Sequence, residues 1–154
     1  MPILIAILAA AFLGLLNCLL ALVKGDAAER LGAGVIIANL AVAFARQMIF
    51  HGGALQVAAL CNDGLTALVL LALTLRYASL WLGVVMLLYA LLFGLNAYYF
   101  VLERHGDLLY MVVSDVDFFG VNLALFVGTV TAWTRRRQIA TAPAPAPALA
   151  EAAP

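Results

Sequence analysis

The feature that most constrains this chain is a series of apolar runs, each about 20 residues long and almost free of charge. A helix of that length crosses a hydrocarbon layer about 30 Å thick, at 1.5 Å per residue. Hydrophobic residues make up 67% of the 154 positions and charged residues only 10%, against about 45–50% and 25% in soluble domains. No soluble core could bury that much apolar surface. The sequence therefore predicts an all-α fold, a polytopic transmembrane helix bundle.

Counting the apolar runs predicts five membrane spans within residues 1–137. The spans cover residues 2–23, 31–50, 54–75, 77–102 and 108–133. The first run is too long, and its start too poor in basic residues, for a secretory signal peptide. The fifth run is interrupted by Asp115 and Asp117. An alternative with four spans, in which residues 108–133 are only partly inserted, therefore stays open.

Residues 138–154 differ in composition from the rest of the chain, since they are rich in alanine and proline. Proline lacks the backbone N–H that a helix interior needs, and an Ala-Pro repeat offers no apolar face to bury. We expect these residues to form a disordered tail after the last span.

The distribution of Lys and Arg predicts the orientation, because these residues accumulate on the cytoplasmic side of a membrane. With five spans, six of the eight basic residues fall at one end: Lys24, Arg30, Arg76, Arg135, Arg136 and Arg137. We expect a bacterial inner-membrane protein with its N-terminus outside and its tail in the cytoplasm. Four spans would move the arginine triplet outside and leave three basic residues inside against five.

Polar residues recur seven positions apart in four of the spans, and residues at this spacing lie on nearly the same helix face. The rows are Gly32, Asn39 and Arg46; Gln56 and Asp63, with Thr66 alongside; Tyr89, Asn96 and Glu103; and Asp115, Asn122 and Thr129. Polar groups that face lipid are unfavourable, so we expect the rows to face one another. They predict an intramembrane polar cluster of Arg46, Asp63, Asn96, Asp115, Asn39 and Asn122.

The charged members of this cluster lie about 6 to 14 Å from the outer ends of their helices, at 1.5 Å per residue. A charge at that depth is normally paired, so we expect Arg46 to pair with Asp63 across the short loop at residues 51–53. Asp117 is about 200° around the helix from Asp115 and is expected to point away. Two interpretations follow: a staple that fixes helix register, or an acidic cavity that binds a cation or relays protons.

Motifs for catalysis, cofactors and metals are missing from the sequence. It contains no H-E-x-x-H, no G-x-S-x-G, no P-loop and no Gly-rich dinucleotide turn. His51 and His105 fall in outer connections without a further ligand at metal spacing. Cys18 and Cys61 lie singly in apolar runs. We expect no enzyme activity, no cofactor and no metal site, and a net charge of zero gives no indication of nucleic-acid binding.

Three short motifs stand out along most of residues 29–137. They are Glu29-Arg30-Leu31-Gly32-Ala33 at the start of a span, Asp63 inside the next span, and Gly128-Thr129 ahead of Arg135-Arg136-Arg137. In these motifs the chain resembles a group of small uncharacterised alphaproteobacterial membrane proteins. The resemblance implies a multi-pass membrane protein and brings no function with it. Residues 24–30 also loosely resemble a small subunit of multisubunit sodium/proton antiporters.

Two functions remain after these exclusions. We expect a protein of the lipid bilayer that acts through interaction with other membrane components, either membrane-protein partners or further copies of itself. The alternative is an ion- or proton-conducting channel or antiporter subunit with an acidic cavity in the outer half of the membrane. A conduit needs polar groups from face to face, whereas the inner half offers little beyond Thr66, Asn122 and Thr129. This asymmetry favours the non-conducting interpretation.

Overall fold

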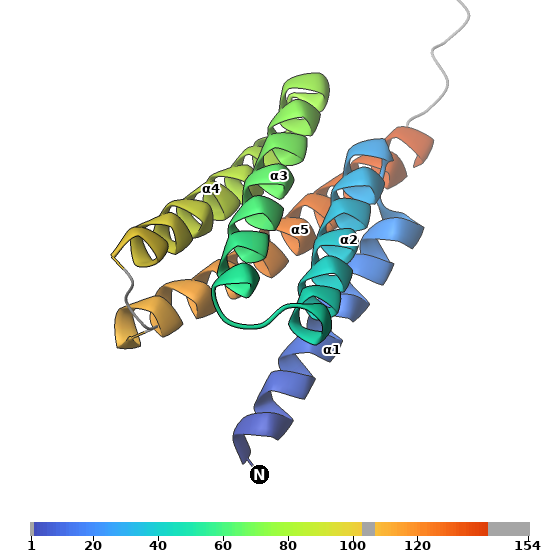
Figure 1. Cartoon of the computed structure of the whole chain (residues 1–154). Coiled ribbons are helices and arrows are strands. Elements are labelled where there is room, and N and C mark those ends of the chain that lie inside the picture. The colour runs from blue at the N-terminus through green and yellow to red at the C-terminus, as the bar shows by residue number, and fades with distance from the viewer. Residues whose placement is uncertain (1, 103–106, 142–154) are drawn as a thin grey trace, which may run out of the picture.

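The computed structural model describes residues 2–102 and 107–141, with residues 2–9 described by their backbone alone (Figure 1). The described residues form five helices and no strand. In chain order these are α1 (Pro2–Lys24), α2 (Ala27–Ile49), α3 (Gly53–Tyr77), α4 (Leu80–Val101) and α5 (Leu108–Thr141). The prediction of an all-α bundle is confirmed.

Four of the helices, α2 to α5, are each long and apolar enough to cross a membrane. Helix α1 has 23 residues, and its fully described part is the shorter apolar segment Ala10–Lys24. The count of five spans therefore stays a prediction. Helix α5 is continuous past Asp115 and Asp117 and is one of these four.

The last helix is longer than the sequence predicted. It runs for 34 residues to Thr141, which places residues 138–141 in a helix instead of the expected disordered tail. Arg, Gln and Ala are good helix formers, and a helix usually ends before the residue that precedes a proline. Pro143 is the first proline of the tail, which accounts for an end near Thr141. The rest of the predicted tail, residues 142–154, lies outside the described residues.

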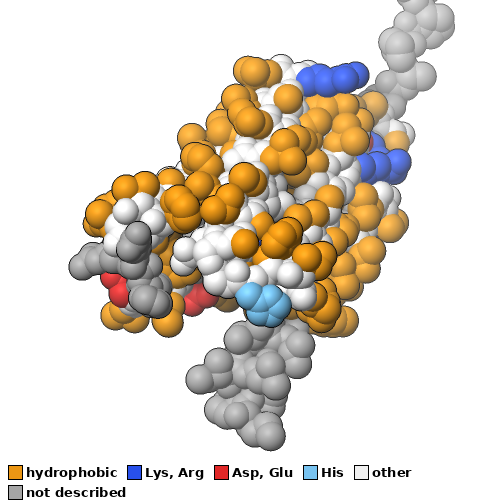
Figure 2. Space-filling view, viewed as in Figure 1, with side chains coloured by type: hydrophobic (Ala, Val, Ile, Leu, Met, Phe, Trp, Pro, Cys, Tyr) orange, Lys and Arg blue, Asp and Glu red, His pale blue; other side chains and the backbone are white. Residues whose placement is uncertain are grey.

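Consecutive helices run antiparallel, so the connections alternate between two ends of the bundle (Figure 1). One end, here called the basic end, holds the α1–α2 and α3–α4 turns and the end of α5. It carries the six basic residues predicted to be cytoplasmic and two acidic residues, Asp26 and Glu29. The other end, the acidic end, holds Arg46 and four aspartates among the described residues. On the face that Figure 2 shows, the blue Lys and Arg side chains lie toward one end and the prominent red acidic side chains toward the other.

Most large apolar side chains face away from the bundle axis. Leu75, Leu80 and Leu108 are 76%, 91% and 76% exposed, and apolar side chains cover much of the visible surface between the two ends (Figure 2). A soluble monomer rarely exposes an apolar patch larger than a few hundred Å². With four helices of spanning length, this surface identifies a membrane protein whose outer solvent is lipid.

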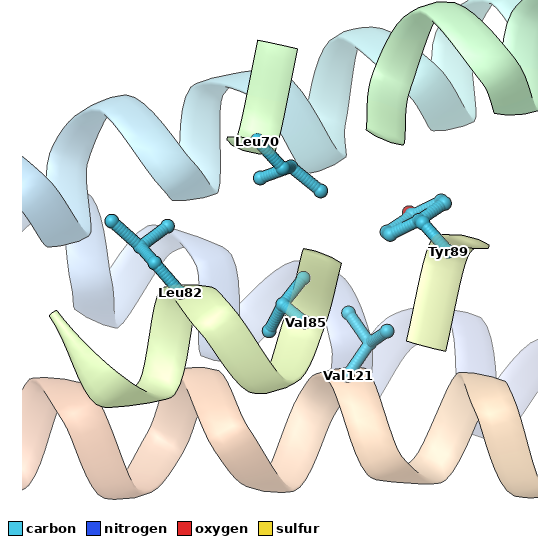
Figure 3. Close-up of a cluster of buried hydrophobic side chains, with 5 residues drawn as sticks. All are labelled: Leu70, Leu82, Val85, Tyr89 and Val121. Carbon is cyan, nitrogen blue, oxygen red and sulfur yellow. The ribbon is translucent and has the colours of Figure 1, made fainter. Parts of the chain in front are cut away.

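The interior of the bundle is small and lies mainly toward the basic end. One buried apolar cluster joins α3, α4 and α5 through Leu70, Leu82, Val85, Tyr89 and Val121 (Figure 3). A second cluster joins α1, α2 and α5 through Cys18, Ala21, Ala33 and Leu125.

Two glycines let the helices approach the ring of Trp81 closely. A Cβ added at Gly128 on α5 would lie 2.6 Å from the indole Cγ, and one added at Gly32 on α2 would lie 2.5 Å from Cη2. Both distances are too short for a real Cβ. Trp81 on α4 therefore fills a slot that only glycines leave open, and its Nε1 donates a hydrogen bond to Glu29 Oε1 at 3.0 Å.

Candidate intramembrane polar site

Asn39 is the centre of a hydrogen-bond network that joins α2, α3 and α4. Its Oδ1 accepts hydrogen bonds from Asn62 Nδ2 and, at 3.1 Å, from Thr66 Oγ1. Its Nδ2 donates to Tyr89 Oη at 3.1 Å. One amide therefore satisfies partners on two other helices, as interhelical polar groups do in lipid.

A second chain of hydrogen bonds starts at the next residue of α3 and reaches α5. Asn96 Nδ2 on α4 donates to Asp63 Oδ2 at 2.7 Å, and Tyr110 Oη on α5 donates to Asn96 Oδ1 at 3.0 Å. Asp63 is only 4% exposed. Because Asn62 and Asp63 are neighbours, the two chains form one polar layer across four helices.

The predicted ion pair between Arg46 and Asp63 is not formed. Within 4.0 Å, the ion pair found among the described residues is Arg136 with Asp26. Arg46 is three residues from the end of α2, whereas Asp63 is ten residues into α3, which puts Asp63 about 10 Å deeper. Asp63 is held by Asn96 instead, and the charge of Arg46 acts on it only from a distance.

Arg46 lines a cavity of about 270 Å³ at the acidic end, together with Gln56, Asn96 and Tyr110. Its Nε and Nη1 are buried and have no hydrogen-bond partner among the described residues. Asn96, the hydrogen-bond partner of Asp63, and Tyr110 line the same cavity as Arg46.

The structure reverses the expected roles of the two aspartates in α5. Asp117 is buried, with 6% exposure, whereas Asp115 is exposed on the outside of the bundle. The buried positions of α5 are Asp117, Val121, Leu125, Gly128 and Thr129. The row Asp115, Asn122 and Thr129 changes from exposed to buried along the helix, because seven residues fall short of two full turns and the row drifts around the axis.

Asn122 is inside the bundle but apart from the polar layer. Its backbone oxygen accepts a hydrogen bond from Asn17 Nδ2 on α1 at 2.7 Å, and its own Nδ2 donates to Phe118 O at 2.9 Å. This contact tethers α1 to α5.

The cluster predicted from the sequence lacks three members of the site: Asn62, Tyr110 and Asp117. Asn62 lies beside Asp63, and both orient inward because their partners are on different helices. Tyr110 and Asp117 are themselves seven residues apart, and the apolar positions Val121 and Leu125 continue their face at helical spacing. That periodicity was the available signal for Asp117.

The polar layer ends at apolar side chains toward the basic end. Leu70, Leu82, Val85 and Leu125 are all 0% exposed. Beyond them Thr129 is buried, and its Oγ1 donates to the backbone oxygen of Leu125 in its own helix at 2.8 Å. The described residues therefore offer no polar path through the bundle.

Comparison with family models, with curated proteins and with solved structures finds no match to this chain. The resemblance to alphaproteobacterial membrane proteins stays a prediction. Within the described part of the chain, no three His, Cys, Asp or Glu side chains gather as metal ligands would. His51 is exposed in the α2–α3 connection, while His105 and Glu103, from the predicted rows and connections, lie outside the described residues.

Proposed function

We propose that this membrane protein acts by binding another membrane component along the outward face of α5, and that it neither conducts ions nor catalyses a reaction. The observation that carries the proposal is the position of Asp115. It is exposed, about 10 Å along α5 from Leu108, and its neighbours on the same face are exposed apolar residues. They are Leu108, Met111, Val112, Phe119 and Leu123.

A carboxylate in the middle of an apolar stripe is unfavourable against lipid. Intramembrane carboxylates normally face a cavity or pair with a donor on another helix. Asp115 faces neither the interior nor a cation of its own chain among the described residues. A partner helix with a basic or hydrogen-bond-donating side chain at this depth would pair with the Asp115 carboxylate. The exposed apolar neighbours would pack against the same partner helix, as associating membrane helices do.

The proposed setting is the bacterial inner membrane, with the basic end in the cytoplasm and the N-terminus outside. Six basic side chains against two acidic ones at that end support this orientation. Reporter fusions after Thr141 test it: an enzyme reporter that works only in the cytoplasm should be active there, and activity of a periplasmic reporter at the same point would reverse the orientation.

Site-specific photo-crosslinking in membranes tests the partner. A photoreactive residue at Val112 or Phe119 should give a protein adduct, and one at Leu65, which is equally exposed on α3, should give only lipid adducts. Asp115→Asn should reduce the Val112 and Phe119 adducts severalfold. An adduct of twice 16.3 kDa identifies a second copy of the chain. Adducts that ignore Asp115→Asn, or lipid adducts alone at all three positions, contradict the proposal.

The alternative is a conduit for ions or protons, and the polar layer through Asn39 and Asp63 favours it. The fully buried Leu70, Leu82, Val85 and Leu125 oppose it, because dehydrated ions need polar groups along the whole path. Ion flux into liposomes that contain the purified chain separates the two. Sustained flux that Asp63→Asn abolishes would establish the conduit and refute the non-conducting proposal.

A further inference from the structure

A second cavity lies between the helices, on the other side of the polar layer from Arg46, and it is partly open, since its lining includes the exposed Leu15 and Leu40. It measures about 190 Å³ and is lined by residues of α1, α2, α4 and α5. Five polar side chains line it, Asn39, Tyr89, Ser114, Asp117 and Asn122, together with the thiol of Cys18. The remaining wall is mainly aliphatic and aromatic, with Ile36 and Phe118 as examples. The cavity is therefore an apolar chamber with one carboxylate.

The carboxylate of Asp117 has no partner in the described part of the chain. Its side chain is 94% buried, since only 6% is exposed, and Oδ1 is fully buried without a hydrogen bond. The titratable groups that act on this region from the other helices are Cys18 on α1, Asp63 on α3 and Tyr89 on α4, and none of them is a cation. Arg46, the only Lys or Arg described at this end, lines the other cavity.

We propose that this chamber binds a small organic cation, a protonated alkylamine, with its ammonium group on Asp117 and its alkyl chain against the apolar wall. A bare carboxylate at membrane depth is unfavourable unless a cation or a proton neutralises it. The ammonium supplies the charge that the protein lacks here, and a hydrogen bond to a carboxylate is among the stronger polar contacts.

The chemistry of the wall distinguishes an organic cation from a metal ion. A hard metal cation replaces its hydration with six or more oxygen ligands, whereas this chamber offers one carboxylate, two hydroxyls and two amides. Of the amide oxygens, Asn39 Oδ1 already accepts from Asn62 and Thr66, and Asn122 Oδ1 accepts from Asn17 Nδ2 at 3.5 Å. Apolar side chains with a few placed polar groups are typical of small-molecule sites. The volume of about 190 Å³ suits a ligand of a few carbon atoms.

The inference is independent of the proposed partner, because Asp115 and Asp117 point to opposite sides of α5. Its test is calorimetric titration of the purified full chain in detergent with n-butylammonium, 1-butanol or sodium. We expect saturable binding of butylammonium and none of butanol, which has the same shape without the charge. This comparison needs only the unaltered chain, so it stands even where a variant does not fold.

Two variants locate the site. Asp117→Asn should weaken butylammonium binding by about thirtyfold or more, because the buried charge pair is lost. Asp26→Asn removes a carboxylate at the basic end, where asparagine is an equally good N-cap, and should bind as the unaltered chain does. Three results would overturn the proposal: equal binding of butanol, no loss in Asp117→Asn, or saturable sodium binding that the same substitution abolishes. Failure of the unaltered chain to bind butylammonium would also overturn it.

Discussion

At the basic end the helices are held by the fit of one large ring between glycines, whereas at the acidic end they are held by amides, phenols and a carboxylate. Trp81 lies against Gly32 and Gly128, where a Cβ in place of either glycine hydrogen would collide with the ring. The neighbouring Leu82 and Leu125 are completely buried. At the acidic end the layer through Asn39 is flanked by two cavities.

The difference follows from the solvent. Lipid tails are as apolar as leucine, so helices in a bilayer gain nothing from hiding apolar side chains and associate through close packing or interhelical hydrogen bonds. This bundle uses one means at each end. A cavity of about 910 Å³ also opens beside Trp81 at the packed end, so the two ends differ in how the helices are joined and not in whether they leave space for a ligand.

The largest effect is expected from removing the centre of the polar layer. Asn39→Leu removes the interhelical hydrogen bonds to Asn62, Thr66 and Tyr89, although Thr66 Oγ1 keeps its bond to Asn62 O at 2.8 Å. Interhelical hydrogen bonds in membranes contribute about 0.6 to 1.7 kcal/mol each. We expect a loss of about 2–4 kcal/mol in the free energy of unfolding, measured by denaturant titration in mixed micelles. Asn17→Leu is the matched control and loses the bonds of one donor, Nδ2, to Asn122 O at 2.7 Å and Asn122 Oδ1 at 3.5 Å. Equal losses of unfolding free energy in the two variants would show that Asn39 is not the centre of the polar layer.

Adding a single methyl group tests the packed end. Gly128→Ala places a Cβ 2.6 to 2.8 Å from three atoms of the Trp81 ring, and overpacking of this kind costs about 1–3 kcal/mol. Gly94→Ala on α4 meets nothing within 4 Å and should stabilise its helix by up to about 1 kcal/mol. Opposite signs in the same unfolding assay would confirm the close fit. A harmless Gly128→Ala would mean that the ring has room to move, and the contrast between the ends would fail.

A smaller effect is expected where the sequence predicted an ion pair. Arg46 and Asp63 make no contact within 4.0 Å, so a double-mutant cycle with Arg46→Gln and Asp63→Asn should give a coupling energy below about 1 kcal/mol. A coupling of about 3–5 kcal/mol, the effect of breaking a buried pair, would show instead that the two charges meet and that the acidic end depends on a salt bridge.

The smallest effect is expected from the ion pair at the basic end. Arg136 Nε lies 2.9 Å from Asp26 Oδ1, but the two side chains are 42% and 49% exposed. Exposed pairs contribute about 0–1 kcal/mol and weaken with salt. Arg136→Gln should therefore change the free energy of unfolding by less than about 1 kcal/mol, and less again at high salt. A larger, salt-independent loss would show that charge, together with packing, stabilises this end.

The sequence predicts the helices of this protein better than it predicts which charges meet. The apolar runs locate all five helices, and four of them, α2 to α5, are long and apolar enough to cross a bilayer. The sevenfold rows find Asn39, Asp63 and Asn96, which all make hydrogen bonds to side chains on other helices. They fail for Asp115 near the start of α5, and they give no information on relative depth, which separates Arg46 from Asp63.

Helix α5 is too long for the membrane it is expected to cross. Its 34 residues extend about 51 Å at 1.5 Å per residue, against a hydrocarbon thickness of about 30 Å. Arg137 stacks over the Trp133 ring at 4.1 Å, a pair suited to the headgroup level, and Thr141 lies about 12 Å farther along the axis. A helix that is longer than the hydrocarbon layer tilts to reduce the hydrophobic mismatch. In a thinner bilayer α5 would tilt more, and its C-terminal end at Thr141 would move sideways, so the position of that end would depend on membrane thickness.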